Sequence, residues 1–160
     1  MQEKEKMIKE KLLQVSMFLI LMGAASSVHL NAQNLEKHTW KNRILLVKTT
    51  DSASEIYQQQ IKEFDNAADE LNVRKFVLYK ITGDNYEMID FTNDELNDSG
   101  KIASKPIGKS LNDKEDFEVL LIGLDGGIKL RQTEVLTKKA LFNIVDAMPM
   151  RRNELNKKIE

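Results

Sequence analysis

The sequence contains no cysteine and only two histidines, His29 and His38, among its 160 residues. Without thiolates, disulfide exchange, thiol peroxidase chemistry and cysteine metal sites are all excluded. His29 lies in an N-terminal segment that we expect to be removed, so a histidine-rich zinc site is excluded and a Ser-His-Asp triad has only His38 available. We expect His38, in a polar stretch, to be a surface residue, and we assign no catalytic residue.

The sequence also lacks the loops that hold phosphate or calcium. Three glycines near residue 125 do not form a dinucleotide-binding motif and lie between predicted strands, which indicates turn glycines. They are Gly123, Gly126 and Gly127. The acidic loop at 84–98 does not follow the EF-hand spacing, so a solvated loop is the simpler interpretation. We therefore predict neither a metal nor a cofactor.

Charge of one sign is not in excess either. The formal net charge is −1, and no long basic stripe interleaved with aromatic residues is present. No overall field attracts polyanions, so nucleic acid is not a predicted partner. A hydrophobic content of 41% with 31% charged residues is typical of a globular protein, and the length suits one domain.

The N-terminal segment has the order of a secretory signal. Basic residues precede an apolar run at 15–28, and small residues follow up to Ala32. The run is short for a membrane span, so we predict a signal peptide at 1–32 and a periplasmic or extracellular protein without stable membrane insertion. The alternatives are an uncleaved N-terminal anchor and an ordinary cytoplasmic helix. Translation from Met7 instead of Met1 would give a better basic start.

The first half of the remaining chain predicts a β-α-β unit. After a polar lead-in at 33–42, a continuous apolar run at 43–48 indicates a strand buried on both faces. Apolar residues at three- and four-residue steps then predict one helix over 56–71, and a second strand follows at 75–81. This order implies parallel strands with a right-handed crossover.

The second half begins with a long polar excursion at 83–116, for which we predict one short strand near 86–91. Two apolar runs, at 117–123 and 128–131, then flank an Asp-Gly turn and predict a hairpin.

A last amphipathic helix is predicted to begin after Thr137 and to stop at Pro149. The fold class is therefore α/β and thioredoxin-like: a β-α-β unit followed by a β-hairpin and a C-terminal helix. We place this domain at 33–155 and a frayed tail at 156–160.

Two surfaces are candidate binding sites. The first joins the first strand to its helix and consists of Thr49, Thr50, Asp51 and Ser52. Ligands favour the carboxyl ends of strands in α/β sheets, and the N–H groups of a helix N-terminus attract anions. Ordinary capping of the helix by one of the last three residues explains the same pattern.

The second surface contains Arg151 and Arg152, which we expect just past the last helix. Two adjacent guanidinium groups suit a carboxylate or anion clamp, with Trp40 and Lys129 as possible neighbours. Capping of the negative end of the helix dipole is the structural alternative. Trp40 either anchors the lead-in against the core or contacts a ligand.

Three segments, at 40–47, 121–130 and 146–152, resemble the domain-of-unknown-function 4174 family. The resemblance covers roughly 34–155 and implies a thioredoxin-like fold without an established catalytic mechanism. It places 49–52 where thioredoxin holds its cysteine pair. The proline that thioredoxin carries directly before the third core strand is absent, and Glu115 and Asp116 stand there.

These observations predict an exported, non-catalytic thioredoxin-like module that binds or scaffolds an unidentified protein or anionic ligand. The alternative is a cysteine-independent enzyme, oxidoreductase-like or hydrolytic, acting at the first strand–helix junction.

Overall fold

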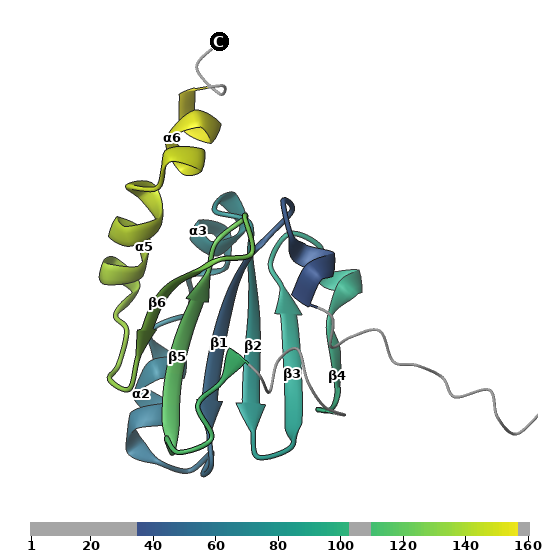
Figure 1. Cartoon of the computed structure of the whole chain (residues 1–160), viewed down its shortest axis with the longest axis vertical. Coiled ribbons are helices and arrows are strands. Elements are labelled where there is room, and N and C mark those ends of the chain that lie inside the picture. Colours follow the sequence, from purple (N-terminus) through teal and green to yellow (C-terminus); the bar gives the residue numbers. More distant parts are fainter. Residues whose placement is uncertain (1–34, 103–109, 157–160) are drawn as a thin grey trace, which may run out of the picture. The chain divides into compact units, whose positions relative to one another are not determined.

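A computed structural model describes residues 35–102 and 110–156, and the predicted signal peptide lies outside these ranges. The described residues form a mixed sheet ordered β4-β3-β2-β1-β5-β6 (Figure 1). Its strands are β1 (Arg43–Thr49), β2 (Phe76–Thr82), β3 (Asn85–Asp90), β4 (Asp98–Lys101), β5 (Phe117–Ile122) and β6 (Ile128–Gln132). The helices are η2 (Leu35–His38), α2 (Glu55–Lys62), α3 (Ala68–Val73), η3 (Asp94–Leu96), α5 (Lys138–Asp146) and α6 (Pro149–Asn156). None of these described helices is long and apolar enough to cross a membrane.

The connections confirm the predicted α/β class. β1 pairs with β2 in parallel, and the crossover between them contains α2 and α3. β5 is antiparallel to β1, β6 is antiparallel to β5, and α5 follows. This order, a parallel pair followed by a hairpin and a helix, is consistent with a thioredoxin-like arrangement. β1 and β5 form continuous apolar runs because side chains cover both faces of the sheet at its centre.

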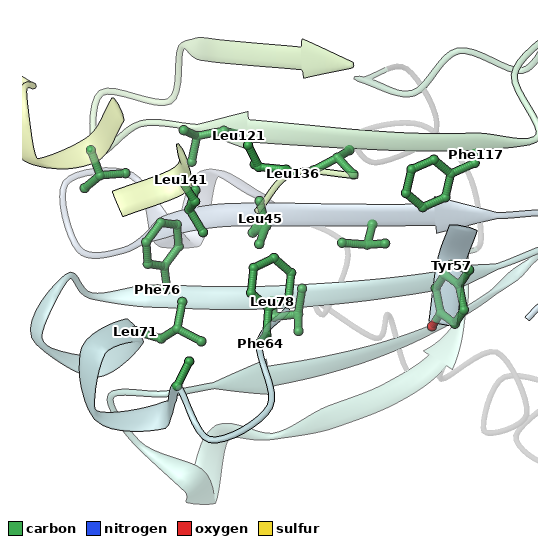
Figure 2. Packing of buried hydrophobic residues seen from close by; sticks show 14 residues of the cluster. Leu45, Tyr57, Phe64, Leu71, Phe76, Leu78, Phe117, Leu121, Leu136 and Leu141 are labelled. Atoms are coloured by element: carbon green, nitrogen blue, oxygen red, sulfur yellow. The ribbon is translucent and has the colours of Figure 1, made fainter. Parts of the chain in front are cut away.

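One face of the sheet carries the larger hydrophobic core (Figure 2). Leu45 and Leu78 from the sheet pack there with residues of the helices, among them Leu71 and Leu141. Gln60 of α2 is fully buried in this layer, and its amide exchanges two hydrogen bonds with the backbone of Leu136, at 2.9 and 2.6 Å. A buried polar side chain is tolerated there because both of its hydrogen-bonding groups are satisfied.

The opposite face is smaller and is built from the alternate residues of the same strands, including Ile44, Tyr79 and Leu120. Part of this face is covered by the loop that precedes β5, and hydrogen bonds of charged side chains attach this loop to the sheet. The Lys48 ammonium donates to the carbonyls of Asn112 (2.6 Å) and Glu115 (2.9 Å). The buried Glu118 carboxylate accepts hydrogen bonds from the Asn112 N–H and from Arg131.

Three local predictions are wrong. The helix at 56–71 is two helices, separated where Asn66 adopts a φ of +56°. The excursion contains a second strand, β4, which pairs with β3 although its sequence, DSGK, has no apolar pattern. Pro149 does not end the helical region; it is the first residue of α6, a position where its missing N–H costs nothing.

Candidate functional site

Trp40, the single tryptophan, lies in the turn between η2 and β1. Its φ of +66° is left-handed, a conformation that costs a non-glycine residue about 1–2 kcal/mol. Its N–H donates to the Leu124 carbonyl at 2.6 Å, so the backbone is held against the β5–β6 turn. The side chain is nevertheless 66% exposed. The interpretation of Trp40 as an anchor in the core is therefore wrong.

Leu124 also lines a groove of about 290 Å³. The groove lies between the start of β1, the β5–β6 turn and the junction of α5 with α6. We call it the Arg43 groove and define it by its lining residues, which are Arg43, Gly123, Leu124, Asp125, Lys129, Met148, Pro149 and Met150. Four of them carry apolar side chains, so the groove offers an apolar wall beside two cations and the Asp125 carboxylate.

Lys129 lies across the β5–β6 turn. Its ammonium is 2.7 Å from Asp125 Oδ2, and this hydrogen bond lowers the pKa of Asp125. The Gly127 N–H donates to the other carboxylate oxygen and acts in the same direction. A Cβ at Gly123 would lie 2.5 Å from Lys129 Cε, so glycine leaves the space that Lys129 occupies. Gly126 has a φ of +75°, which supports the turn interpretation of these glycines.

Behind the groove lies a partly buried group of ion pairs, the Arg43 cluster. It consists of Arg43, Arg74, Lys75, Asp146, Arg151 and Glu154. Glu154 is within 3.5 Å of three cations, at 3.1 Å from Arg151, 3.3 Å from Arg43 and 3.5 Å from Lys75. Asp146 pairs with Arg74 at 2.6 Å and with Arg151 at 3.3 Å.

Arg43 is the most deeply buried member, with 1% of its side chain exposed. Its Nη1 donates to the Arg74 carbonyl at 2.8 Å, but its Nε has no acceptor among the described residues. Burial lowers the pKa of Arg43, although the charge of Glu154 opposes this shift. Burial raises the pKa of Glu154, but hydrogen bonds from Arg151 and the charge of Arg43 outweigh it, so the pKa is lowered.

The two neighbouring arginines do not form the proposed clamp. Arg151 is 5% exposed, and its guanidinium donates to the Val73 carbonyl at 2.7 Å as well as to Asp146 and Glu154. Arg152 is exposed, because consecutive residues of α6 do not face the same way. Neither caps the end of α5 in the predicted manner, since both lie inside α6. Arg151 is a structural residue.

Several polar groups of the turn at Thr49–Ser52 are bound within the turn or by the start of α2. The Thr49 hydroxyl donates to the Asp51 carbonyl at 2.8 Å, and the Asp51 carboxylate accepts the Ala53 N–H at 2.8 Å. Gln58 donates to the Ser52 carbonyl at 2.7 Å. The cap position of α2 falls on Ser54, two residues beyond the predicted range. This arrangement supports a structural turn and leaves the enzymatic alternative without a specific geometric feature.

Asp116, which precedes β5, lies beside this junction. Its carbonyl accepts the Thr50 N–H at 2.9 Å, and its carboxylate accepts the Thr50 hydroxyl at 3.2 Å. No cis peptide bond occurs in the described residues. These hydrogen bonds close the junction between β1 and α2 against the start of β5.

Residues 34–154 match the model of a family described as a domain of unknown function (DUF4174). The chain belongs to this family. No curated protein and no solved structure gives a significant match. The three segments through which the sequence resembles DUF4174 meet at the Arg43 groove, since they supply Trp40 and Arg43, Leu124 and Lys129, and residues 148–150.

His38 corrects another prediction about this DUF4174 domain. The side chain is buried, and its Nε2 lies 2.8 Å from the Tyr79 hydroxyl on the smaller face of the sheet. Burial lowers the pKa of His38, while a hydrogen bond with Asn42 opposes the shift. His38 thus fastens η2, and with it the Trp40 turn, to the sheet.

The acidic loop of the DUF4174 domain also serves the fold. The Asp90 carboxylate accepts the N–H and the hydroxyl of Thr92, and the Asp98 carboxylate accepts the Tyr86 hydroxyl at 2.9 Å. Burial and this hydrogen bond raise the pKa of Tyr86 to about 12. Within residues 35–102 and 110–156, no three His, Asp or Glu side chains are grouped closely enough to hold a metal ion.

Sequence reasoning identified Trp40 and Lys129 but missed Arg43 and Glu154. Arg43 is the first residue of the predicted strand at 43–48, and Glu154 lies near the end of the predicted domain without any distinguishing neighbour. The two residues are 111 positions apart and meet only because α6 returns over the start of β1. The only feature of the sequence that could have drawn attention to Arg43 was a basic residue at the first position of an otherwise apolar strand.

Proposed function

We propose that this DUF4174 domain is an exported, non-catalytic binding or scaffolding module that contacts a partner protein at Trp40 and the adjoining Arg43 groove. The observation that carries the proposal is Trp40: a large aromatic side chain 66% exposed on a left-handed backbone, hydrogen-bonded to a residue of the groove. Exposed tryptophans are enriched at the centres of protein interfaces because they supply a large contact area with few rotatable bonds.

Strain supports the same conclusion. A strained non-glycine residue persists only where the surrounding structure or a function holds it, and such residues gather at functional sites. The exposed side chain of Met150, which lines the groove, extends the surface available to a partner. The Thr49 hydroxyl is bound within its own turn and the Thr50 hydroxyl is bound by Asp116, so the hydrogen bonds at this junction support a structural turn and give the enzymatic alternative no support.

Export is the second part of the proposal and rests on the sequence at 1–32. The test is the mass of the protein recovered outside the cytoplasm. A mature chain beginning at Gln33 supports the proposal. A full-length chain that stays with the membrane fraction contradicts it and favours the uncleaved anchor.

Binding is tested by chemical cross-linking in cells followed by identification of the captured proteins. Three proteins are compared: the wild type, Trp40→Ser and the control Leu96→Ser. Leu96 lies in η3 between β3 and β4 and is 55% exposed, so its replacement removes a similar apolar exposure elsewhere. All three must show cooperative thermal unfolding before capture is compared.

We expect a partner that the wild type and Leu96→Ser capture equally and that Trp40→Ser captures at least about tenfold less, as for an interface hot spot. Equal capture by all three proteins would show that Trp40 is not the contact, and the proposed site would be wrong.

A further inference from the structure

The Arg43 cluster contains more positive than negative charge. Among the described residues it joins four cations, Arg43, Arg74, Lys75 and Arg151, to only two carboxylates, those of Asp146 and Glu154. Water screens Lys75, whose side chain is 49% exposed, but the side chains of Arg43, Arg74 and Arg151 are only 1%, 15% and 5% exposed. Three shielded cations therefore face two carboxylates. Buried charges are normally matched, so this surplus of one shielded cation marks a place where an anion is stabilised.

Arg43 brings part of this positive charge to the wall of the groove. It is a member of both the cluster and the groove wall, and its Nε–H has no acceptor among the described residues. Pro149, the first residue of α6, lies in the same wall, and the N-terminal end of a helix carries a partial positive charge. The groove therefore places two cations, Arg43 and the Asp125-paired Lys129, beside the apolar side chains of Leu124, Met148 and Met150.

We infer that the Arg43 groove receives the C-terminal residue of a partner polypeptide, with its apolar side chain against Met148 and Met150 and its carboxylate beside Lys129 and Arg43. This inference rests on the proposed function and names the chemical group that the binding module recognises. Lys129, with 32% of its side chain exposed, makes the direct contact. Arg43, nearly inaccessible, contributes its charge at short range.

The size of the groove favours a chain end. Its volume of about 290 Å³ lies at the lower limit of the pockets, about 300–1,000 Å³, that enclose drug-sized ligands. A volume of this size suits one terminal residue. The preceding residues of the partner would then pass over exposed apolar surface, which includes Met150 in the groove lining and Trp40, whose N–H is bonded to Leu124 of the groove.

Substitutions of Asp125 and of Lys129 should change the affinity for the ligand in opposite directions, which provides a test. Its carboxylate already holds the Lys129 ammonium, so it competes with a carboxylate brought by the ligand. Asp125→Asn frees Lys129 from this charge and retains an oxygen that accepts the Gly127 N–H. Lys129→Gln removes the contact itself. A purely structural Lys129–Asp125 pair predicts that both changes weaken binding.

The experiment uses the full chain and three N-acetylated tetrapeptides. One ends in two leucines with a free carboxylate, the second is the same peptide amidated at its C-terminus, and the third is amidated and carries its carboxylate on a glutamate between two leucines. Binding is followed by the emission of Trp40, the single tryptophan. The Arg43 Nε–H signal in ¹H–¹⁵N spectra, assigned with Arg43→Lys, gives a second readout.

We expect the free-acid peptide to bind at least about tenfold more tightly than the amide, as for loss of a charge-assisted hydrogen bond. Lys129→Gln should weaken it by about tenfold, and Asp125→Asn should strengthen it by about threefold. The matched control, Arg152→Gln, removes an exposed cation outside the groove wall and should change the affinity less than about twofold.

Equal binding of acid and amide would overturn the inference, as would no response to the acid at about 10 mM, or equal weakening by Lys129→Gln and Arg152→Gln. Tighter binding of the internal glutamate peptide would overturn the assignment to a chain end. Failure here is distinguishable from failure of the proposed function: cross-linking that depends on Trp40 would still support a partner surface, with a different chemistry of recognition.

Discussion

The two ends of β1 differ in how completely their polar groups are satisfied. At the carboxyl end, the Thr49 hydroxyl and the Asp51 carboxylate are bound within the turn, and the Thr50 hydroxyl is bound by Asp116. At the amino end, among the residues that the structure describes, the Arg43 Nε–H has no acceptor and the surrounding cations outnumber the carboxylates, and Trp40 is exposed. The α/β rule that places ligands at the carboxyl ends of strands therefore points to the less receptive end of this strand.

This difference shows that the features of a binding site need not lie at the position where ligands usually bind in a given fold. The junction after β1, where the α/β rule places ligands, is closed by hydrogen bonds between Thr50 and Asp116. The features typical of binding, which are an exposed aromatic, unmatched charge and a hollow, are instead gathered about one strand length away.

The largest expected effect tests the charge surplus at the amino end. Glu154→Gln leaves Arg43, Lys75 and Arg151 without their shared carboxylate and should lower the free energy of unfolding by about 3 kcal/mol. Arg43→Met removes one cation from a cluster that has too many and should cost roughly half as much. Urea denaturation measures both. A larger cost for Arg43→Met would show that the cluster is not cation-rich in its effect on stability.

A smaller effect is expected at the carboxyl end of β1. Asp51→Ala removes the acceptor of the Ala53 N–H and should destabilise the domain by about 1 kcal/mol, as for loss of a local capping bond. Asp51→Asn keeps an acceptor and serves as the control. Because this end is a structural turn, neither variant should change the proteins captured by cross-linking. Loss of capture with both variants at unchanged stability would reverse the comparison.

Trp40→Gly separates strain from binding. Glycine adopts a φ of +66° without steric cost, so the free energy of unfolding should stay constant or rise by up to about 1 kcal/mol. Capture of the partner should be lost. A clear destabilisation would instead mean that the Trp40 side chain contributes to packing, and its exposure would lose its functional meaning.

The smallest effect concerns the pH dependence that His38 contributes. Burial holds the pKa of His38 in the folded protein below the value of about 6.5 expected for the unfolded chain. The unfolded state then binds more protons between these two values, so the stabilising contribution is complete above pH 6.5 and is lost as the pH falls toward the folded pKa. His38→Gln should abolish this part of the dependence. The comparison is made from urea denaturation of both proteins at several pH values between 8 and 5, and identical slopes would contradict the buried position of His38.

The sequence by itself determined the excluded chemistries, the α/β class and the order of the main elements. These conclusions depend on composition and on local periodicity: an apolar run such as 44–47 indicates a strand whatever its neighbours are. The two surfaces named from the sequence were less successful. Arg151 and Thr49–Ser52 have the residue types of binding sites, but they form hydrogen bonds within the fold.

Tertiary structure alone decided where the unmatched groups lie. Arg43 and Glu154 are brought together across 111 positions, and the exposure of Trp40 depends on the Leu124 carbonyl and on the anchoring of η2 by His38. Charge balance and burial are properties of a neighbourhood in space, which local sequence patterns do not encode. The absent cysteines exclude thiol chemistry, and the comparison of the two ends of β1 is the reason that we propose a binding surface at the amino end.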